Sequence, residues 1–424
     1  MTIGLLLFVV LLVLGAPVFL ALTAGGAYLA LVELRLPLSM LAQQMYISVD
    51  VFVLMAVPYF IFAGNIMLNC GPSRYLFRFL DALVGHLPGG MSAAAVLACM
   101  IFGALSGSGI ATVVAIGSIA LPEMLRQGYD KRSSMGLITC SGTIGQMIPP
   151  SIYMVLFASL VQGDVSRYFM AGIIPGLLTG VMLIVVAVLM ARRDGMRLKA
   201  ASDWPERWTT FKAAFPVLLM PPIVLGGIYG GIFTPTEAAA VAIVYSLLIS
   251  GLVYRTLTVA NFVKSARDAI SSTAAIFIIL GGATLLAVTV TYLKLPQHLV
   301  DEVTRLGLSP MMLLLAIVVL YLLLGMVMDP VPIMYITVPI LLPVLLAAQI
   351  DLVHFAVITV AAMMVAQATP PFGMALFAMS GLFRTPIAVV VRGSLPYLAV
   401  LVATTLLVLF FPSLSLLLPN MMGR

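Results

Sequence analysis

The chain is organised around two stretches that follow one plan: SGSGIATVVAIGSIALPEMLRQGYDKRSSMGLITCSGTIGQMIPPSI at residues 106–152 and DPVPIMYITVPILLPVLLAAQIDLVHFAVITVAAMMVAQATPPFG at residues 329–373. Each has a tip broken by glycine or proline, an apolar helix, a polar turn and an apolar segment that stops at a double proline. A shift of 221 positions superimposes their landmarks: Pro122 on Pro343, Asp130 on Asp351, Gln146 on Gln367, Pro149 on Pro370 and Pro150 on Pro371. Because the backbone breaks persist while the apolar filling differs, the pattern predicts an internal structural repeat.

The composition places the chain in a lipid bilayer. Of its 424 residues, 62% are hydrophobic and only 8% are charged, whereas a soluble domain carries about 25% charged residues. The sequence therefore predicts an all-α polytopic membrane protein. The net charge of +6 does not indicate a nucleic-acid partner, because the basic residues gather in short loops, where the positive-inside rule explains them.

The cysteines and the first apolar run carry no redox or targeting signal. Cys70, Cys99 and Cys140 form no CxxC motif, which favours small buried thiols over metal or redox chemistry. The run at residues 3–32 lacks a basic start and is too long for a signal-peptide core, so we expect a membrane span there.

The apolar segments predict an inverted repeat with two re-entrant helical hairpins and two broken helices. The expected hairpins are 89–105 with 110–125, and 310–324 with 331–346; the broken helices are 134–159 and 352–380; the other spans are 3–32, 47–68, 168–190, 213–231, 235–254, 269–292 and 386–411. Two amphipathic segments, 72–86 and 294–305, are expected at the interface, and polar linkers at 192–212 and 255–268. The count gives nine spans, five of them between the hairpins, so the hairpins enter from opposite faces. The N-terminus is then cytoplasmic and the C-terminus external.

The breaks themselves indicate function. Within hydrocarbon, each unsatisfied backbone group costs several kcal/mol, so four breaks at similar depth are expected to serve a solute. Helix N-termini suit an anion, and free carbonyls and hydroxyls suit sodium. Hydroxyls lie at both kinds of break: Ser106, Ser108 and Thr112 at the first tip, Ser141, Thr143 and Ser151 at the first double proline, and Thr369 at the second. Asp329 is the only carboxylate at either tip, so we expect a cation or several donors beside it.

Simpler interpretations remain open for single residues. Glycine and serine also serve close helix packing in membranes. Interhelical hydrogen bonding and solute contact are equally consistent with Gln146 and Gln367. Glu237, in the turn TPTE, is expected to cap the following helix rather than carry a proton.

The motifs SGSGIAT, GYD, IPPSI, MDPVP and TPPFG, together with LGAP, AGN, AGIIPG and TPTEAAA, resemble the large permease subunit of TRAP (tripartite ATP-independent periplasmic) transporters over essentially the whole length. The resemblance implies an elevator-type fold of the ion-transporter superfamily, with a scaffold and a mobile transport domain. It also implies sodium-coupled uptake of an organic acid across the bacterial inner membrane, with no cofactor besides sodium. The implied partners are a small four-span membrane subunit and a periplasmic substrate-binding protein; this sequence has a segment for neither, so we expect both to be separate chains.

The resemblance also implies domains and site residues. Scaffold spans with an arm helix occupy 1–88 and 213–307, transport-domain repeats occupy 89–191 and 308–424, and 192–212 is a cytoplasmic loop. Sodium site 1 comprises Ser106, Gly107, Ser108, Thr112, Ser141, Thr143 and Gly145; sodium site 2 comprises Gly325, Asp329, Gln367 and Thr369; the substrate contacts Ser108, Gly109, Pro149, Pro150, Ser151, Pro330, Pro370 and Pro371.

Two other functions fit the sequence less well. A cation/proton or metalloid exchanger on the related scaffold needs buried titratable groups, and the deep acids here reduce to Asp329. An intramembrane serine enzyme needs a base beside Ser106 or Ser108, but His86, His298 and His354 fall in segments expected to be polar turns or interfacial pieces.

Overall fold

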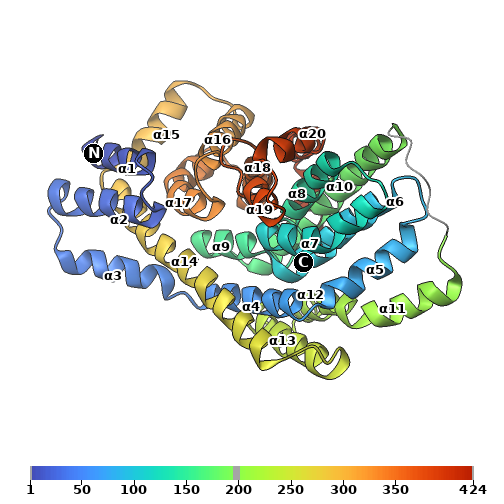
Figure 1. Ribbon diagram of the computed structural model, residues 1–424. Helices are drawn as coiled ribbons and strands as arrows, with labels where there is room; N and C mark the ends of the chain where they lie inside the picture. Colours follow the sequence, from blue (N-terminus) through green and yellow to red (C-terminus); the bar gives the residue numbers. More distant parts are fainter. Residues whose placement is uncertain (1, 194–200, 423–424) are drawn as a thin grey trace.

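The computed structural model describes residues 2–193 and 201–422, and within these residues every regular element is a helix (Figure 1). Eight of the helices are long and apolar enough to cross a membrane. The prediction of an all-α polytopic membrane fold is therefore confirmed.

The two repeats form two matching sets of helices. The first set is α6 (Gly90–Ser106), α7 (Gly109–Arg126), α8 (Lys131–Thr143), α9 (Ile152–Val161) and α10 (Val165–Arg193); the second is α16 (Pro310–Gly325), α17 (Pro330–Ala347), α18 (Leu352–Gln367), α19 (Met374–Leu382) and α20 (Ile387–Phe410). In each set a two-helix hairpin is followed by a helix that breaks at the double proline. The sets pack on one another in the upper and central part of Figure 1, with α20 against α8.

The same capping positions begin equivalent helices in both repeats. Ser108 caps α7 and Asp329, 221 positions later, caps α17. Asp130 caps α8 through the Ser133 amide at 2.7 Å, and Asp351 caps α18 through the Val353 amide at 2.8 Å. An N-cap oxygen accepts hydrogen bonds from amides that the helix leaves free. The two repeats therefore share the positions of their N-cap residues as well as the order of their helices.

Glycines allow each hairpin to lie directly against its broken helix. A Cβ atom on Gly103 would lie 2.3 Å from the Cα atom of Gly145, and a Cβ on Gly325 would lie 2.3 Å from the Cβ of Ala366. At these two crossings no side chain fits between the hairpin helix and the broken helix. The close contact holds each hairpin against the break of its own repeat.

We expect Gly103→Ala to lower the thermal unfolding midpoint of the purified protein. The new methyl group meets backbone and cannot be relieved by a rotamer change, which costs roughly 1–3 kcal/mol. Gly381→Ala is the matched control, because Gly381 has open space around its Cα. Equal midpoints for Gly103→Ala and wild type would contradict the close contact.

Two of the remaining helices contact the hairpins, α4 the first and α14 the second. Helix α4 (Ala56–Asn69) approaches the first tip so closely that a Cβ on Gly64 would lie 2.9 Å from the Cα of Ser106. Helix α14 (Val259–Tyr292) packs along α4 and α17. The amphipathic segments form α5 (Pro72–Val84) and α15 (Leu295–Arg305), as predicted.

The N-terminal run is not one span, as the sequence had suggested. It forms α1 (Thr2–Val13) and α2 (Val18–Tyr28, continued by a π turn to Glu33), which fold back on each other because Gly15, with φ +80°, and Pro17 end the first helix. The fold-back brings Gly4 against Leu29. Helix α3 (Leu38–Val49) then precedes α4 as a separate element. The cytoplasmic position of the N-terminus therefore no longer follows from a count of spans.

Two expected linkers are helical instead. Residues 194–200 lie outside the described residues, but α11 (Trp204–Leu218) already begins inside the predicted loop 192–212 and runs into α12 (Met220–Tyr229). The predicted linker 255–268 is largely the first part of α14, which Thr258 caps. Thr234 and Glu237 form the predicted capping box of α13 (Pro235–Leu248). A final helix, α21 (Ser413–Met422), packs on α10 and was not predicted.

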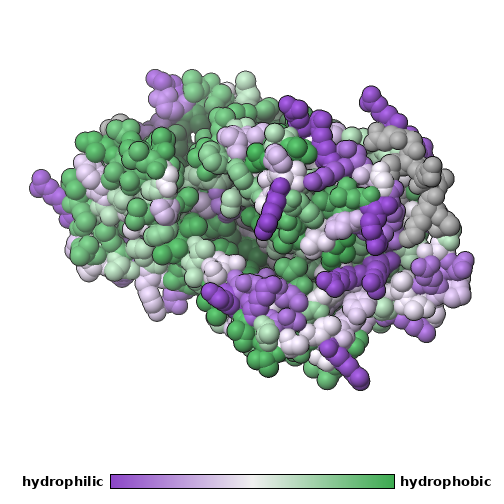
Figure 2. All heavy atoms as spheres, viewed as in Figure 1, coloured by the Kyte–Doolittle hydropathy of each residue, from purple (hydrophilic) through white to green (hydrophobic). Residues whose placement is uncertain are grey.

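Polar and apolar residues separate on the visible face of the molecule. Hydrophobic residues cover α1 to α3 at the left of Figure 2, and hydrophilic residues gather over α5 and α11 at the right.

Cys70, Cys99 and Cys140 are buried free thiols, as predicted. His354 is not in a polar turn: it is buried in α18, where its Nδ1 lies 2.7 Å from the Ser415 hydroxyl.

Candidate functional site

The first tip lies against the first break, as the repeat predicts. Gly107 has φ +61°, and a Cβ there would meet Ile152 and the Pro150 carbonyl oxygen at 3.0–3.1 Å. A Cβ on Gly109 would lie 2.4 Å from Nε2 of Gln146 and 3.2 Å from the Cα of Thr143. The tip can occupy this position only because both residues lack a side chain.

Hydroxyls of the first tip form one small network. The hydroxyls of Ser106 and Thr112 lie 3.1 Å apart, and Thr112 also donates to the Ser108 carbonyl oxygen at 2.8 Å. Ser106 and Thr112 are both buried, and Thr112 Oγ1 lies 3.1 Å from the Cβ position of Gly145. Four predicted members of sodium site 1 are thus brought together by the tip and the break.

Other predicted members of sodium site 1 use their hydroxyls within their own helix. Ser141 donates to the Leu137 carbonyl oxygen at 2.6 Å, and Thr143 donates to that of Cys140 at 2.8 Å. Ser151, which was predicted as a substrate contact, caps α9 by accepting from the Met154 amide at 3.3 Å, and it donates to the Gln146 carbonyl oxygen. Their local role is to satisfy backbone groups around the break.

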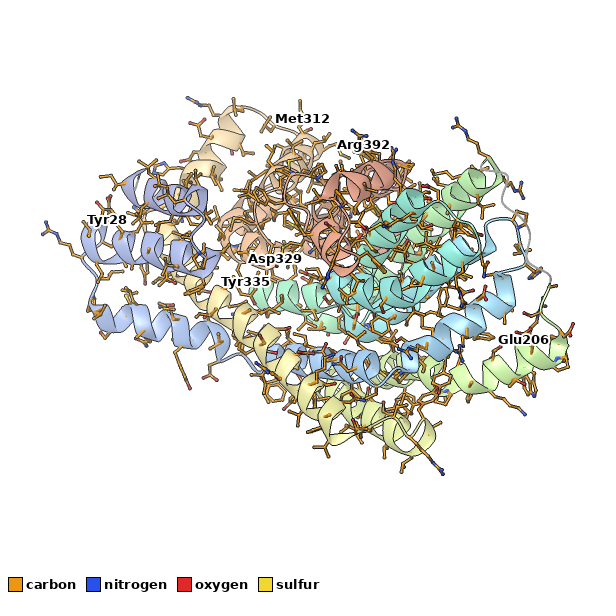
Figure 3. All side chains as sticks on the ribbon, in the orientation of Figure 1. Tyr28, Glu206, Met312, Asp329, Tyr335 and Arg392 are labelled. Atoms are coloured by element: carbon orange, nitrogen blue, oxygen red, sulfur yellow. The ribbon has the colours of Figure 1, made fainter. Side chains whose placement is uncertain are left out.

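The second tip holds the carboxylate. Asp329 is partly buried, and its Oδ1 accepts from the Val331 amide at 3.1 Å. Figure 3 shows Asp329 near the centre of the molecule, close to Tyr335 and far from Glu206 at the right-hand edge. At the second break Thr369 donates to the Val365 carbonyl oxygen at 2.6 Å, while the carbonyl oxygens of Gln367 and Thr369 both face Gly373.

The two breaks meet through their equivalent glutamines. Nε2 of Gln146 donates to Oε1 of Gln367, and Nε2 of Gln367 donates to the Tyr153 hydroxyl at 3.4 Å. Both glutamine side chains are buried. Of the two interpretations that the sequence left open, the structure shows the interhelical hydrogen bond.

A small cavity with both polar and apolar residues in its wall lies between the two tips and helices α4 and α14. Its volume is about 110 Å³, room for about four water molecules. The lining residues come from α4 (Ile61, Gly64 and Asn65), the first hairpin (Ser106, Ser108 and Ala111), α9 (Ile152 and Tyr153), α14 (Ser272 and Ile276) and α17 (Val331). No arginine or lysine is among them.

Three helices begin at this cavity. Ser108, Ile152 and Val331 lie in its wall, at the N-terminal ends of α7, α9 and α17. Helix N-termini carry partial positive charge and free amides. At α17 the Val331 amide is already bonded to Asp329, and Pro330 and Pro332 have no N–H group. The N-termini of α7 and α9 are therefore the ones that favour a small anion without a basic side chain.

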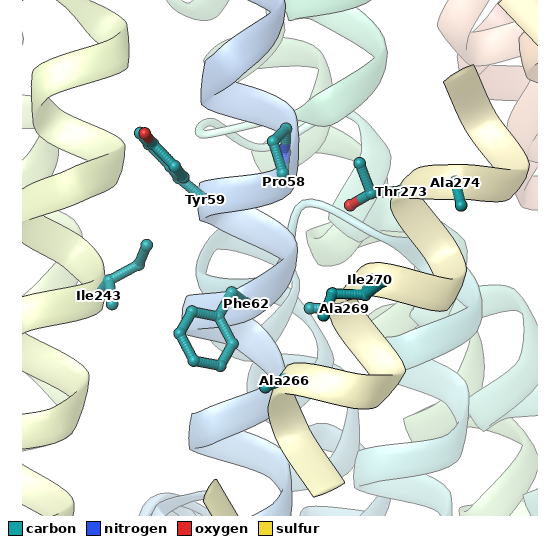
Figure 4. Close-up of a pocket in the computed structure, with 9 residues that line it drawn as sticks. All are labelled: Pro58, Tyr59, Phe62, Ile243, Ala266, Ala269, Ile270, Thr273 and Ala274. Atoms are coloured by element: carbon teal, nitrogen blue, oxygen red, sulfur yellow. The ribbon is translucent and has the colours of Figure 1, made fainter. Parts of the chain in front are cut away.

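A larger pocket elsewhere is chemically different. About 550 Å³ in volume, it lies between α4, α13 and α14 and is lined by apolar side chains such as Tyr59, Phe62 and Ile243, with Thr273 as a hydroxyl (Figure 4). Because its wall is almost entirely apolar, it does not suit a carboxylate.

The predicted substrate residues divide between the cavity and its surroundings. Ser108 lines the cavity, and Gly109, Ser151 and Pro330 each neighbour a lining residue in sequence. Pro149 and Pro150 are buried at the first break, whereas Pro370 and Pro371 are exposed at the second. The sequence analysis did not predict Asn65, Tyr153 and Ser272 as lining residues. Asn65 and Ser272 could have been found because each is a polar residue within an apolar helix.

Comparison with known proteins identifies the family. Residues 5–414 match the family described as "Tripartite ATP-independent periplasmic transporter, DctM component". The chain is 39% identical over 383 residues to the C4-dicarboxylate TRAP transporter large permease protein DctM of Pseudomonas aeruginosa, covering 90% of each protein. It is 35% identical over 380 residues to the sialic acid TRAP transporter large permease protein SiaM of Vibrio cholerae, covering 90% of this chain and 89% of the relative.

A solved structure supports the fold. The YdaH transporter of Alcanivorax borkumensis superimposes with a TM-score of 0.62 and 16% sequence identity, covering 97% of this chain and 98% of that one. Together with the tip and break geometry, these similarities show that the chain belongs to the DctM family of TRAP transporter large permease subunits, which are membrane transport proteins for organic acids and not enzymes.

Proposed function

We propose that this chain carries a compact organic acid, of the C4-dicarboxylate class, inward across the bacterial inner membrane and is driven by sodium. The observation that carries the proposal is the cavity of about 110 Å³ at which three helices begin and which no basic side chain lines. Helix N-termini and bound cations together can balance a carboxylate there. The relative from Pseudomonas aeruginosa, named for C4-dicarboxylates, supports the solute class.

Sodium is supported by the chemistry of the two tips. The first offers neutral hydroxyl and carbonyl oxygens around Ser106 and Thr112, ligands that hard cations take in proteins. The second offers the carboxylate of Asp329, two residues before Val331 in the cavity wall. A cation beside Asp329 removes the repulsion between this carboxylate and an entering anion.

The position of the cavity supports an elevator-type mechanism. One wall comes from α4 and α14, in the predicted scaffold, and the other from both hairpins, in the predicted transport domain. Movement of the hairpins along α4 and α14 would carry the solute while sodium pre-forms the site. The proposed partners are a small membrane subunit and a periplasmic binding protein, the remaining components of a tripartite system.

The test is uptake of radiolabelled succinate into proteoliposomes that contain this chain and its small subunit, with the binding protein outside. We expect uptake with an inward sodium gradient and only background uptake when potassium replaces sodium. Equal uptake under both gradients would reject sodium coupling, and no uptake of succinate or malate under either would reject the proposed solute class.

The two breaks predict one-sided access in the state that the structure represents. Ser151 and Phe372 are equivalent positions, 221 apart, but Ser151 is fully buried and Phe372 is 56% exposed. We expect a membrane-impermeant maleimide to label Phe372→Cys rapidly and Ser151→Cys slowly, since the native cysteines are buried. Mass spectrometry of intact protein measures both rates, with wild type as the background control. Equal rates would show that the two breaks are equally accessible.

A further inference from the structure

Gln146, Gln367 and Tyr153 form a hydrogen-bonded chain whose direction is the same at each step. Gln146 donates to Gln367, and Gln367 donates to the Tyr153 hydroxyl at 3.4 Å. Among the described residues, the Tyr153 hydroxyl donates to no acceptor. The chain therefore ends with a free O–H group.

That last O–H group belongs to Tyr153, in the wall of the cavity between the two tips. Tyr153 is the second residue of α9, whose N-terminus opens on the cavity beside Ser106 and Ser108. The tyrosine is 93% buried, and a buried hydroxyl without an acceptor costs free energy until one arrives. A carboxylate in the cavity would supply that acceptor.

We propose that the Tyr153 hydroxyl donates a hydrogen bond to the carboxylate of the transported solute, and that Gln367, held by Gln146, is the positioning residue for that hydroxyl. The inference rests on the proposed function and adds one solute contact and its support. Hydrogen bonds in a chain strengthen one another in a medium of low dielectric constant. Because each glutamine comes from a different repeat, the hydroxyl is correctly placed only while the two breaks remain together.

Gln146 lies between the second break and the first tip. Its side chain is completely buried, yet its Oε1 atom has no partner among the described residues. The amide is held by its hydrogen bond to Gln367 and by its packing over Gly109 of the first tip. Movement of the first tip would shift this amide and, through it, the Tyr153 hydroxyl.

The test measures the KM for binding-protein-delivered succinate in the proteoliposome assay. A hydrogen bond to a charged group is worth about tenfold or more in affinity. We expect Tyr153→Phe, which removes only the hydroxyl, to raise KM about tenfold or more while the maximal rate and the sodium concentration for half-maximal uptake stay unchanged. Tyr335→Phe is the matched control, since the Tyr335 hydroxyl pairs with Ser159, at 3.0 Å, and does not line the cavity; its KM should equal that of wild type.

The positioning role has its own measurement. Gln367→Met should raise KM in the wild-type background and should have no further effect on KM in the Tyr153→Phe background, because the hydroxyl that it positions is then absent. An unchanged KM in Tyr153→Phe would overturn the solute contact, and additive effects of the two substitutions would overturn the positioning role. If wild type takes up no succinate, the proposed function fails rather than this inference.

Discussion

Asp329→Asn is expected to reduce sodium-driven uptake by roughly 100-fold or more while the protein remains folded. The carboxylate begins α17 at the second tip and accepts from the Val331 amide at 3.1 Å. Asparagine keeps an oxygen for that bond and is an equally good N-cap, so helix and hairpin should persist. What it removes is the negative charge, and loss of one member of a buried ion pair commonly costs about 3–5 kcal/mol.

Asp351→Asn is the control for this substitution. Asp351 caps α18 by accepting from the amides of Val353 and His354, so the same chemical change is made at a helix start that does not line the cavity. Uptake by Asp351→Asn should stay within a few-fold of wild type. Sodium-driven uptake by Asp329→Asn at the wild-type rate would remove Asp329 from the ion site, provided that both variants show the unfolding midpoint of wild type.

The main architecture could be predicted from the sequence because membrane helices break only at recognisable residues. The tips, the double prolines and the polar turns are 221 positions apart in the two repeats, and each marks the end of a helix in the structure. The capping residues Asp130 and Asp351 fall at the starts of the broken helices for the same reason. Helices whose ends are set by glycine, proline or a capping residue can therefore be located from the sequence alone.

Elements that are defined by what packs on them were predicted less well. The residues at 3–32 have the length and polarity of one span, but Gly15 and Pro17 end the first helix, and Gly4 packs against Leu29 where the two helices fold back on each other. Residues 255–268 are polar enough for a linker, yet residues 259–268 form the first part of the 34-residue helix α14. Apolar periodicity does not tell one long helix from two, or a linker from an exposed helix end.

The site shows the same division. The repeat predicts that Ser108 and Asp329 occupy equivalent positions, but one is a hydroxyl and the other a carboxylate. Ser106, Thr112 and Ser151 of the first repeat correspond to Val327, Ile333 and Phe372 of the second. The first tip is thus rich in hydroxyls and closed, whereas the second depends on one carboxylate beside an exposed break. The two repeats therefore offer different oxygen ligands to the sodium ions that we propose.

Ser108→Leu is the second substitution with a large expected effect: uptake should fall to background. Ser108 lines the cavity of about 110 Å³, and a leucine side chain there occupies the space between the tips. The substitution also removes an N-cap, since the Ser108 hydroxyl accepts from the Ala111 amide at 3.4 Å. Loss of a serine cap costs about 0.5–2 kcal/mol, so the effect on stability must be separated from the effect on the pathway.

Ser309→Leu makes that separation. Ser309 is exposed and caps α16 of the second hairpin by accepting from the Met312 amide at 3.3 Å, so both substitutions lose the same kind of cap, but only Ser108→Leu fills the cavity. The two variants should therefore show similar falls in unfolding midpoint and very different rates of succinate uptake. If Ser108→Leu transported as well as Ser309→Leu, the first tip would lie outside the solute pathway, and the three helix N-termini around it would need another explanation.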